Sequence, residues 1–131
     1  MGQRGIGDGQ FKGFSSVAVD PINNKVYVAD SLNSRIQVFD SNGKFLTKWS
    51  IPEWGRPYGF EDLAVDSKTG RLYASSVNMN AVLIFDLNGN RIGSLPPKPP
   101  DTLDGPSALA LANGKLYVLN MHANRVTVID L

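Results

Sequence analysis

Short runs of alternating apolar and polar residues recur along the chain and predict β-strands. Residues 25–30 read KVYVAD and residues 35–40 read RIQVFD, and both runs are rich in β-branched and aromatic side chains. Asn, Asp, Gly and Pro separate these runs, and apolar spacing of about 3.6 residues, typical of helices, is not found. The pattern therefore predicts an all-β chain.

Three segments of the chain align with one another, at residues 15–46, 61–92 and 106–131. Their equivalent tyrosines are Tyr27, Tyr73 and Tyr117, which gives a period of about 45 residues. A fixed period of this length indicates a repeat architecture, in which each unit buries its apolar faces against its neighbours.

The strands of one unit differ in their expected exposure. In the second strand of the first unit, Val26 and Val28 point to one face and Tyr27 and Ala29 to the other, so both faces need cover. The last strand, at 44–49, mixes Lys and Thr with apolar residues, as an outer strand would. Four such strands repeated about every 45 residues predict blades of a β-propeller, which we place approximately at residues 13–49, 59–95 and 105–131.

Asn-Gly pairs mark a predicted hairpin turn in each unit, at 42–43, 88–89 and 113–114. Asn and Gly both tolerate positive φ, which the two central residues of a type I′ turn require. The three pairs therefore predict type I′ hairpins.

The first unit resembles an NHL repeat, on the residues VAVD, VYVAD, NSRIQVF and NGK, preceded by GDGQF at 7–11. The second unit departs most, because Ser76, Met79 and Ala81 stand where the first unit has an acid, an amide and an arginine. The resemblance implies a β-propeller segment. It also implies a protein partner, since NHL-like propellers commonly mediate protein interaction.

Three blades are too few to close a ring, because propellers contain about four to eight. Gln3 aligns with Trp49 at the end of an outermost strand, whereas Leu131 follows the third strand of the third unit, which thus lacks its outer strand. We expect the chain to complete a six-bladed or similar ring, either as part of a longer chain or by head-to-tail association of two copies. The expected partner is another copy or a further propeller-containing chain.

Asp30, Asn33 and Arg35 combine a carboxylate, an amide and a guanidinium within six positions, so they could begin a metal or catalytic site. They could also fasten a turn: Asp30 can accept hydrogen bonds from N–H groups of the turn, Asn33 tolerates a left-handed conformation, and Arg35 can lie against the carboxylate. Since the second unit keeps none of them, we interpret the trio as structural turn residues and predict no catalytic residue.

His122 is the one histidine, and the chain contains no cysteine. A zinc site needs three or four protein ligands, and a calcium site needs about six to eight oxygens, so we predict no metal and no cofactor. Acids repeated at strand ends, such as Asp40 and Asp86, are interpreted as hydrogen-bond acceptors of the turns.

Departures from the repeat indicate where a partner could bind, because they add aromatic, Arg and Met side chains to loops on one face of the propeller. The candidate partner-binding residues are Arg56, Tyr58, Glu61, Asp62, Asn78, Met79, Met121 and His122.

Charge and hydropathy restrict the partners further. The 13 basic and 12 acidic residues are scattered, so nucleic acid is a disfavoured partner. No apolar run reaches the roughly 20 residues of a membrane span, which predicts no membrane insertion. The absence of cysteine leaves the compartment undetermined, with a periplasmic or secreted location favoured and a cytoplasmic one open.

The favoured function is a non-enzymatic protein-interaction or assembly module. Two alternatives stay open. One is a lactonase- or lyase-like propeller enzyme with a metal in its central channel, and the other is an RNA-binding NHL propeller, which needs a continuous basic face.

Overall fold

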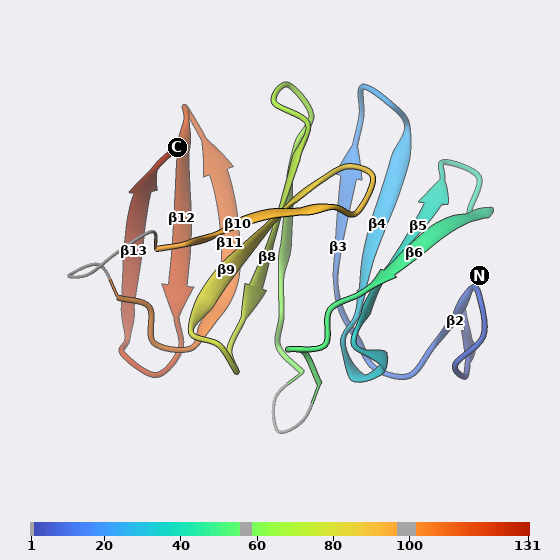
Figure 1. The fold of residues 1–131 in the computed structure, drawn as a ribbon, viewed down its shortest axis with the longest axis horizontal. Coiled ribbons are helices and arrows are strands. Elements are labelled where there is room, and N and C mark those ends of the chain that lie inside the picture. The colour runs from blue at the N-terminus through green and yellow to red at the C-terminus, as the bar shows by residue number, and fades with distance from the viewer. Residues whose placement is uncertain (1, 56–58, 97–101) are drawn as a thin grey trace.

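The computed structural model describes residues 2–55, 59–96 and 102–131 of the chain. Its main strands form three antiparallel sheets, which follow one another along the chain and stand side by side (Figure 1). Blade one contains β3 (Phe14–Asp20), β4 (Lys25–Asp30), β5 (Arg35–Asp40) and β6 (Phe45–Ser50). Blade two contains β7 (Leu63–Asp66), β8 (Arg71–Ser76), β9 (Ala81–Asp86) and β10 (Arg91–Leu95). Blade three contains β11 (Pro106–Ala112), β12 (Lys115–Asn120) and β13 (Arg125–Asp130).

Strands are hydrogen-bonded in chain order within each sheet, and the innermost strands β3, β7 and β11 are neighbours. Two sheets of four strands and one of three confirm the predicted all-β propeller segment, including the third blade without an outer strand. The helical content of the described residues is a single 3₁₀ turn, η1 (Ser31–Asn33). No helix in the described part of the chain is both long enough and apolar enough to cross a membrane.

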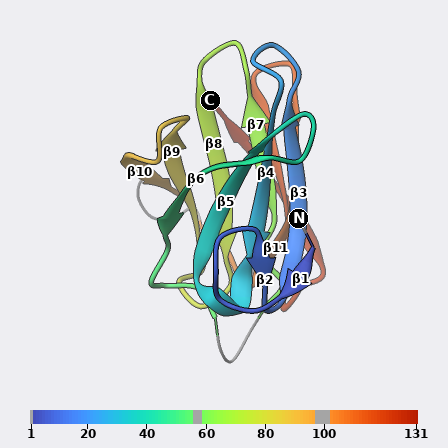
Figure 2. The same ribbon diagram turned by 90° about the vertical axis from the view of Figure 1, so that its right-hand side faces the viewer.

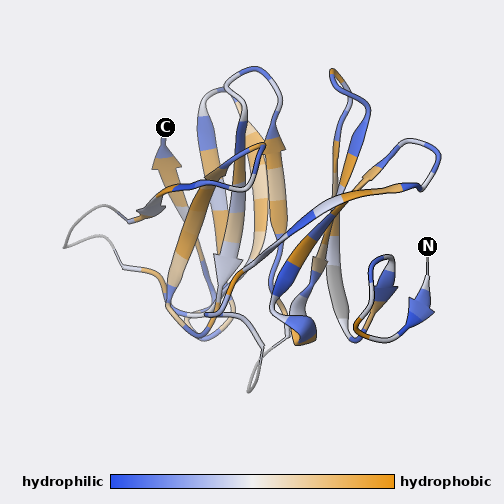
Figure 3. Cartoon of the chain, turned by 45° about the vertical axis from the view of Figure 1, so that its right-hand side comes forward, coloured by the Kyte–Doolittle hydropathy of each residue, from blue (hydrophilic) through white to orange (hydrophobic). Residues whose placement is uncertain are grey.

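Apolar side chains fill the spaces between the blades, because every central strand is apolar on both faces. We call the face of a blade that points to the next blade in the chain its downstream face, and the opposite one its upstream face. For blade three, the downstream face is the one formed by the equivalent repeat positions. Tyr27, Ile36 and Val38 on the downstream face of blade one pack with residues such as Leu72 and Phe85 of blade two. In Figure 3, hydrophobic residues lie along the strands and hydrophilic residues gather in the turns.

A second apolar cluster joins blades two and three in the same way. Its downstream residues are Tyr73, Val82 and Ile84, and its upstream residues include Leu116 and Val118. Each interface thus uses the same repeat positions, as expected when each unit buries its neighbour.

The Asn-Gly turns differ from the prediction at two of three places. Asn113 and Gly114 both have positive φ, of 53° and 74°, so the type I′ prediction is right there. At 42–43 and 88–89 only the glycine has positive φ, and the strand register shifts beside the turn. The cause at the first of these is Asp40, whose Oδ1 accepts hydrogen bonds from the N–H groups of Asn42 and Lys44, both 2.9 Å long.

Asp86 caps the equivalent turn of blade two, where its Oδ1 accepts from the N–H groups of Asn88 and Asn90. An acid bound to two N–H groups favours a three-residue turn with one left-handed glycine and a bulge, rather than a two-residue type I′ turn.

The N-terminal residues fold back against the upstream face of blade one. β1 (Gln3–Arg4) and β2 (Gln10–Phe11) form a small parallel pair, and Phe11 packs against Phe39 with ring centroids 5.9 Å apart. This N-terminal segment, residues 2–12, lies over the lower part of blade one (Figure 2).

Candidate functional site

The turn between β4 and β5 brings Asp30, Asn33 and Arg35 together. Asp30 is fully buried, and its Oδ2 accepts hydrogen bonds from Arg35 Nε at 2.7 Å and from Asn33 Nδ2 at 3.0 Å. The buried carboxylate is therefore paired with a guanidinium and an amide from its own turn. Such partners offset the cost of burying a charge, and the bond to the guanidinium is charge-assisted.

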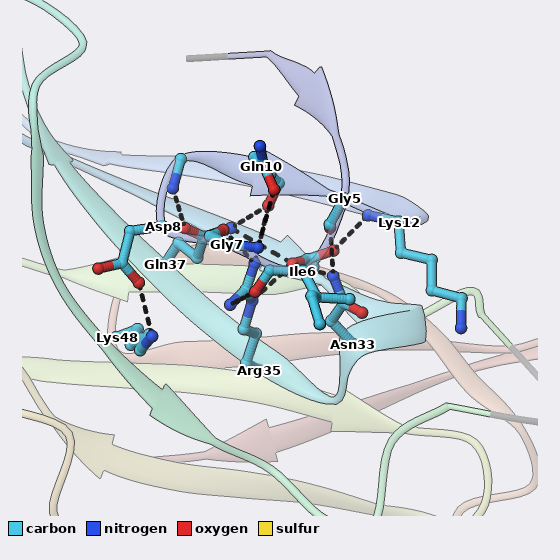
Figure 4. A network of polar contacts seen from close by, with 12 residues as sticks. Gly5, Ile6, Gly7, Asp8, Gln10, Lys12, Asn33, Arg35, Gln37 and Lys48 are labelled. Atoms are coloured by element: carbon cyan, nitrogen blue, oxygen red, sulfur yellow. Dashed lines mark hydrogen bonds and ion pairs between the residues drawn. The ribbon is translucent and has the colours of Figure 1, made fainter.

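Arg35 also binds the N-terminal segment (Figure 4). Its Nη1 donates to the carbonyl oxygen of Ile6 at 2.9 Å, and its Nη2 donates to those of Gly7 and Gln10 at 2.9 and 2.8 Å. The planar guanidinium, which presents five N–H groups in a fixed fork, thus joins one carboxylate to three carbonyls.

Neighbouring side chains add to this anchorage. Asn33 Nδ2 donates to the carbonyl of Gly5 at 3.0 Å, and Gln37 accepts from the N–H of Gly9 at 2.9 Å. The polar groups of this cluster are therefore occupied in holding a loop, and the carboxylate of Asp30 does not face solvent.

Two details of the turn prediction need correction. The backbone N–H that binds Asp30 Oδ1 belongs to Lys12 in the N-terminal segment, at 3.0 Å, and not to the turn itself. The left-handed residue is Ser34, with φ of 51°, and not Asn33. The amide of Asn33 points instead to the carboxylate of Asp30 and to the carbonyl of Gly5, which is 28 residues away in the sequence.

The predicted partner-binding residues separate in the structure. Arg56 and Tyr58 lie outside the described residues. Glu61 is only 1% exposed, so its side chain forms no part of a surface. Burial raises the pKa of Glu61, although hydrogen bonds from its own backbone, from Ser31 and from the backbone of Gly55 oppose the rise.

Asp62 connects all three blades through its carboxylate. Its Oδ1 accepts hydrogen bonds from Ser16 Oγ of blade one and from the N–H of Leu63 at 2.9 Å. Its Oδ2 accepts from the N–H of Leu109 in blade three at 2.8 Å. Asp62 was predicted as a partner-binding residue, whereas its carboxylate accepts hydrogen bonds from Leu63 and Leu109 of the inner strands β7 and β11.

The other four candidates stay together on two neighbouring turns at the lower end of Figure 1. We call this the loop surface, made of Asn78, Met79, Met121 and His122. Met79 and Met121 are exposed. The two turns are linked through Gly105, whose N–H donates to Asn80 Oδ1 and whose carbonyl accepts from the N–H of Met121.

Possible metal ligands do not gather at one point in the described part of the chain, where no three His, Cys, Asp or Glu side chains are grouped for an ion. His122 Nδ1 lies 3.7 Å from a carboxylate oxygen of Asp104. Strand-end acids bind their own turns, as shown by Asp20 Oδ1, which accepts from the N–H groups of Ile22 and Asn23.

An exposed apolar surface covers the downstream face of blade three. We call it the blade-three surface, made of Tyr117, Leu119, Val126 and Val128, whose side chains are 36–56% exposed. Tyr117 is paired with Val128 and Leu119 with Val126 across β12 and β13, so the four side chains are contiguous.

The blade-three surface repeats positions that are buried elsewhere in the chain. Tyr117, Val126 and Val128 align with Tyr27, Ile36 and Val38, which are at most 1% exposed. These residues were not among the predicted site residues, although the repeat alignment contains them.

Comparison with known proteins identifies the repeat. Residues 15–39 match the model of the NHL repeat. A search of curated protein sequences found no significant match.

Two solved structures of β-propeller proteins are similar to the chain. The Kuenenia stuttgartiensis hydrazine synthase has a TM-score of 0.72 and 16% identity, over 98% of this chain and 35% of that one. A streptogramin B lyase structure has a TM-score of 0.61 and 16% identity, over 92% of this chain and 41% of that one. The chain thus spans well under half the length of either, and identity this low shows the fold alone. Residues 15–39 are thus similar to an NHL repeat, and the chain folds as a segment of a β-propeller.

Proposed function

We propose that this chain is a non-enzymatic assembly module, which joins another propeller-forming chain, its own or a different one, through the blade-three surface. One observation carries the proposal. The repeat positions of Tyr117, Val126 and Val128 are buried in both blade interfaces inside the chain and are exposed only where no further blade follows among the described residues.

The hydrophobic effect favours covering this surface. Burial of apolar area contributes about 25 cal/mol per Å², and contiguous exposed apolar patches commonly mark interaction sites. β13 is also an edge strand, paired with β12 on one side only within the described chain, so its outer backbone groups can pair with a further strand.

The polar residues that could have suggested chemistry support the same proposal. Arg35 and Asp30 hold the N-terminal segment, and Asp62 holds the inner strands, so these groups work within the scaffold. A rigid scaffold with an apolar exposed sheet suits assembly better than it suits a reaction.

The loop surface is a second contact region within the same proposal. Met121 and His122 belong to the turn between β12, which carries Leu119, and β13, which carries Val126. The loop surface therefore borders the blade-three surface, and a partner seated on one can reach the other.

Sedimentation velocity over a wide range of concentrations tests the proposal. The double substitution Tyr117→Lys with Val128→Lys places two charges on the blade-three surface, while Ile92→Lys, at an exposed position on the outer strand β10, is the matched control. We expect the wild-type protein and the control to associate and the double variant to sediment as a folded monomer, with an unchanged circular dichroism spectrum. Equal association of the double variant would overturn the proposal, and a wild-type monomer at every concentration would exclude a second copy as the joined chain.

A further inference from the structure

We propose that the occupant of the blade-three surface is blade one of a second copy, and that two copies close a six-bladed ring. This inference rests on the proposed assembly function and names its partner. It would repeat, between chains, a contact that the chain already makes twice within itself.

The upstream face of blade one offers the matching positions. Within the chain, Leu63 and Val65 of β7 pack against blade one, and Leu109 and Leu111 of β11 pack against blade two. Their equivalents on β3 are Val17 and Val19, which are 61% and 56% exposed. Blade one therefore has an uncovered inner strand facing away from blade two, at the positions by which the other blades receive a neighbour.

The N-terminal segment fits the same arrangement. In blade one, Ile36 of β5 is paired with Trp49 of the outer strand β6. Gln3 aligns with Trp49, and Val126 aligns with Ile36. β1 would therefore lie beside β13 of the second copy, where blade three lacks an outer strand, with Gln3 opposite Val126.

Both strands have an edge available for this pairing. β1 is paired only with β2, and β13 only with β12, within the described residues. The N-terminal segment already lies over the lower part of blade one (Figure 2), where Phe11 packs with Val28 and Phe39, so the second copy needs to cover only the remainder near β3.

Two-fold symmetry forms both contacts at once. Blade three of each copy meets blade one of the other, so no blade face is left over, and six blades lie within the range of about four to eight that propellers use. A head-to-tail contact that did not close would instead produce open chains.

Engineered disulfides test this pairing directly. The chain contains no cysteine, so in the double variant Gln3→Cys with Val126→Cys no native thiol can form a competing disulfide. Residues opposite each other in antiparallel strands have Cα atoms about 4.5–5.5 Å apart, within the range of about 4.4–6.8 Å that a disulfide spans. The N-terminus and β13 lie at opposite ends of a single chain (Figure 1), so the bond can form only between copies.

The expected product after mild oxidation is a covalent dimer of twice the chain mass, seen by non-reducing electrophoresis and by light scattering. Gln3→Cys with Ile92→Cys is the control and should remain uncrosslinked. A ladder of higher covalent oligomers would overturn the closed ring.

Association that depends on the blade-three surface but gives no Gln3–Val126 crosslink would overturn this inference and leave the assembly function standing. A wild-type monomer at every concentration would overturn this inference as well, because a second copy would then not occupy the blade-three surface.

Discussion

The Oδ2 atom of Asp62 accepts a hydrogen bond from the backbone N–H of Leu109 at 2.8 Å, across the boundary between blades two and three. Its Oδ1 atom accepts from Ser16 Oγ across the boundary between blades one and two. One carboxylate therefore links the inner strands of all three blades. The same position in blade three is Ala108, which has no oxygen to offer to a following blade.

Replacing Asp62 by Ala should lower the free energy of unfolding by about 1–3 kcal/mol, because the partly buried N–H of Leu109 loses its hydrogen-bond acceptor. Asp62→Asn keeps one acceptor oxygen and should cost less. Urea denaturation measures both. Asp8→Ala is the control, since its ion pair with Lys48 is exposed and should contribute at most about 1 kcal/mol. Equal effects of Asp62→Ala and Asp8→Ala would contradict the role of Asp62 as a link.

Replacing Arg35 by Ala should be among the most damaging single changes. It leaves the carboxylate of Asp30 buried without its cation, which typically costs about 3–5 kcal/mol. It also removes three hydrogen bonds to the N-terminal segment. We expect faster amide hydrogen exchange at Gly9 and Lys12, measured by mass spectrometry or NMR.

Arg125→Ala tests the equivalent position in blade three, where the arginine is exposed and binds Thr102. Its effect should stay within about 0.5 kcal/mol, as for most surface substitutions. A large loss for Arg125→Ala, or a small one for Arg35→Ala, would show that the N-terminal anchorage has been misjudged.

Two turn glycines should differ in their tolerance of alanine. Gly114 has φ of +74° with open space around it. Gly114→Ala should therefore lower the free energy of unfolding only by the cost of holding alanine in a left-handed conformation, about 1–2 kcal/mol. At Gly89, with φ of +92°, an added Cβ would lie 2.7 Å from the ring of Trp49, so overpacking adds about 1–3 kcal/mol. The midpoint temperature of thermal unfolding should therefore be lower for Gly89→Ala than for Gly114→Ala. The reverse order would contradict the close approach of Trp49 to Gly89.

The stability of the protein should depend on pH through Glu61. Burial raises its pKa in the folded state above the ordinary value of 4.5, so the folded state binds the proton more tightly than the unfolded state. Stability associated with Glu61 is therefore present at low pH and is lost as pH rises through the folded pKa. Glu61→Gln does not titrate and should gain stability relative to the wild type between about pH 4 and pH 7, measured by urea denaturation.

Glu53 provides a control, because its pKa is shifted in the opposite direction to that of Glu61. A hydrogen bond from Arg91 lowers the pKa of Glu53, so the stability that it contributes is present above its ordinary pKa and is lost as pH falls. Glu53→Gln should therefore lose stability relative to the wild type as pH rises. If the stability difference from the wild type changed with pH in the same direction for both variants, the assignment of Glu61 as the acid that is destabilised by burial would be contradicted.

Much of the architecture was predictable because it depends on local pattern. Alternation along residues such as Val26 to Ala29 marks a strand with two covered faces, and the recurrence of Tyr27 at Tyr73 and Tyr117 marks three units. The three strands of the third sheet, β11 to β13, followed from the alignment of the third unit with the first two. These signals are carried by neighbours in the chain, so no knowledge of distant contacts was needed.

The turn geometry and the site residues were predicted less well than the strands, because they depend on particular hydrogen bonds and on contacts between distant residues. The turn at 42–43 depends on the carboxylate of Asp40, which occupies two N–H groups and selects a bulged turn. Glu61 and Asp62 stand in a polar loop sequence that suggests a surface, but Glu61 is buried and Asp62 hydrogen-bonds to Ser16 and Leu109 of the neighbouring blades. A single sequence position does not show which distant backbone will approach it.

The sequence by itself determined the strands, the three units and the apolar faces between them, because a period of two within strands and a period of about 45 residues between units are properties of the chain alone. Only the tertiary structure decided that Asp30, Asn33 and Arg35 hold the N-terminal segment and that Asp62 reaches Leu109. The physical reason is that buried polar groups must find hydrogen-bond partners wherever folding brings them, and those partners lie 18 to 47 residues away.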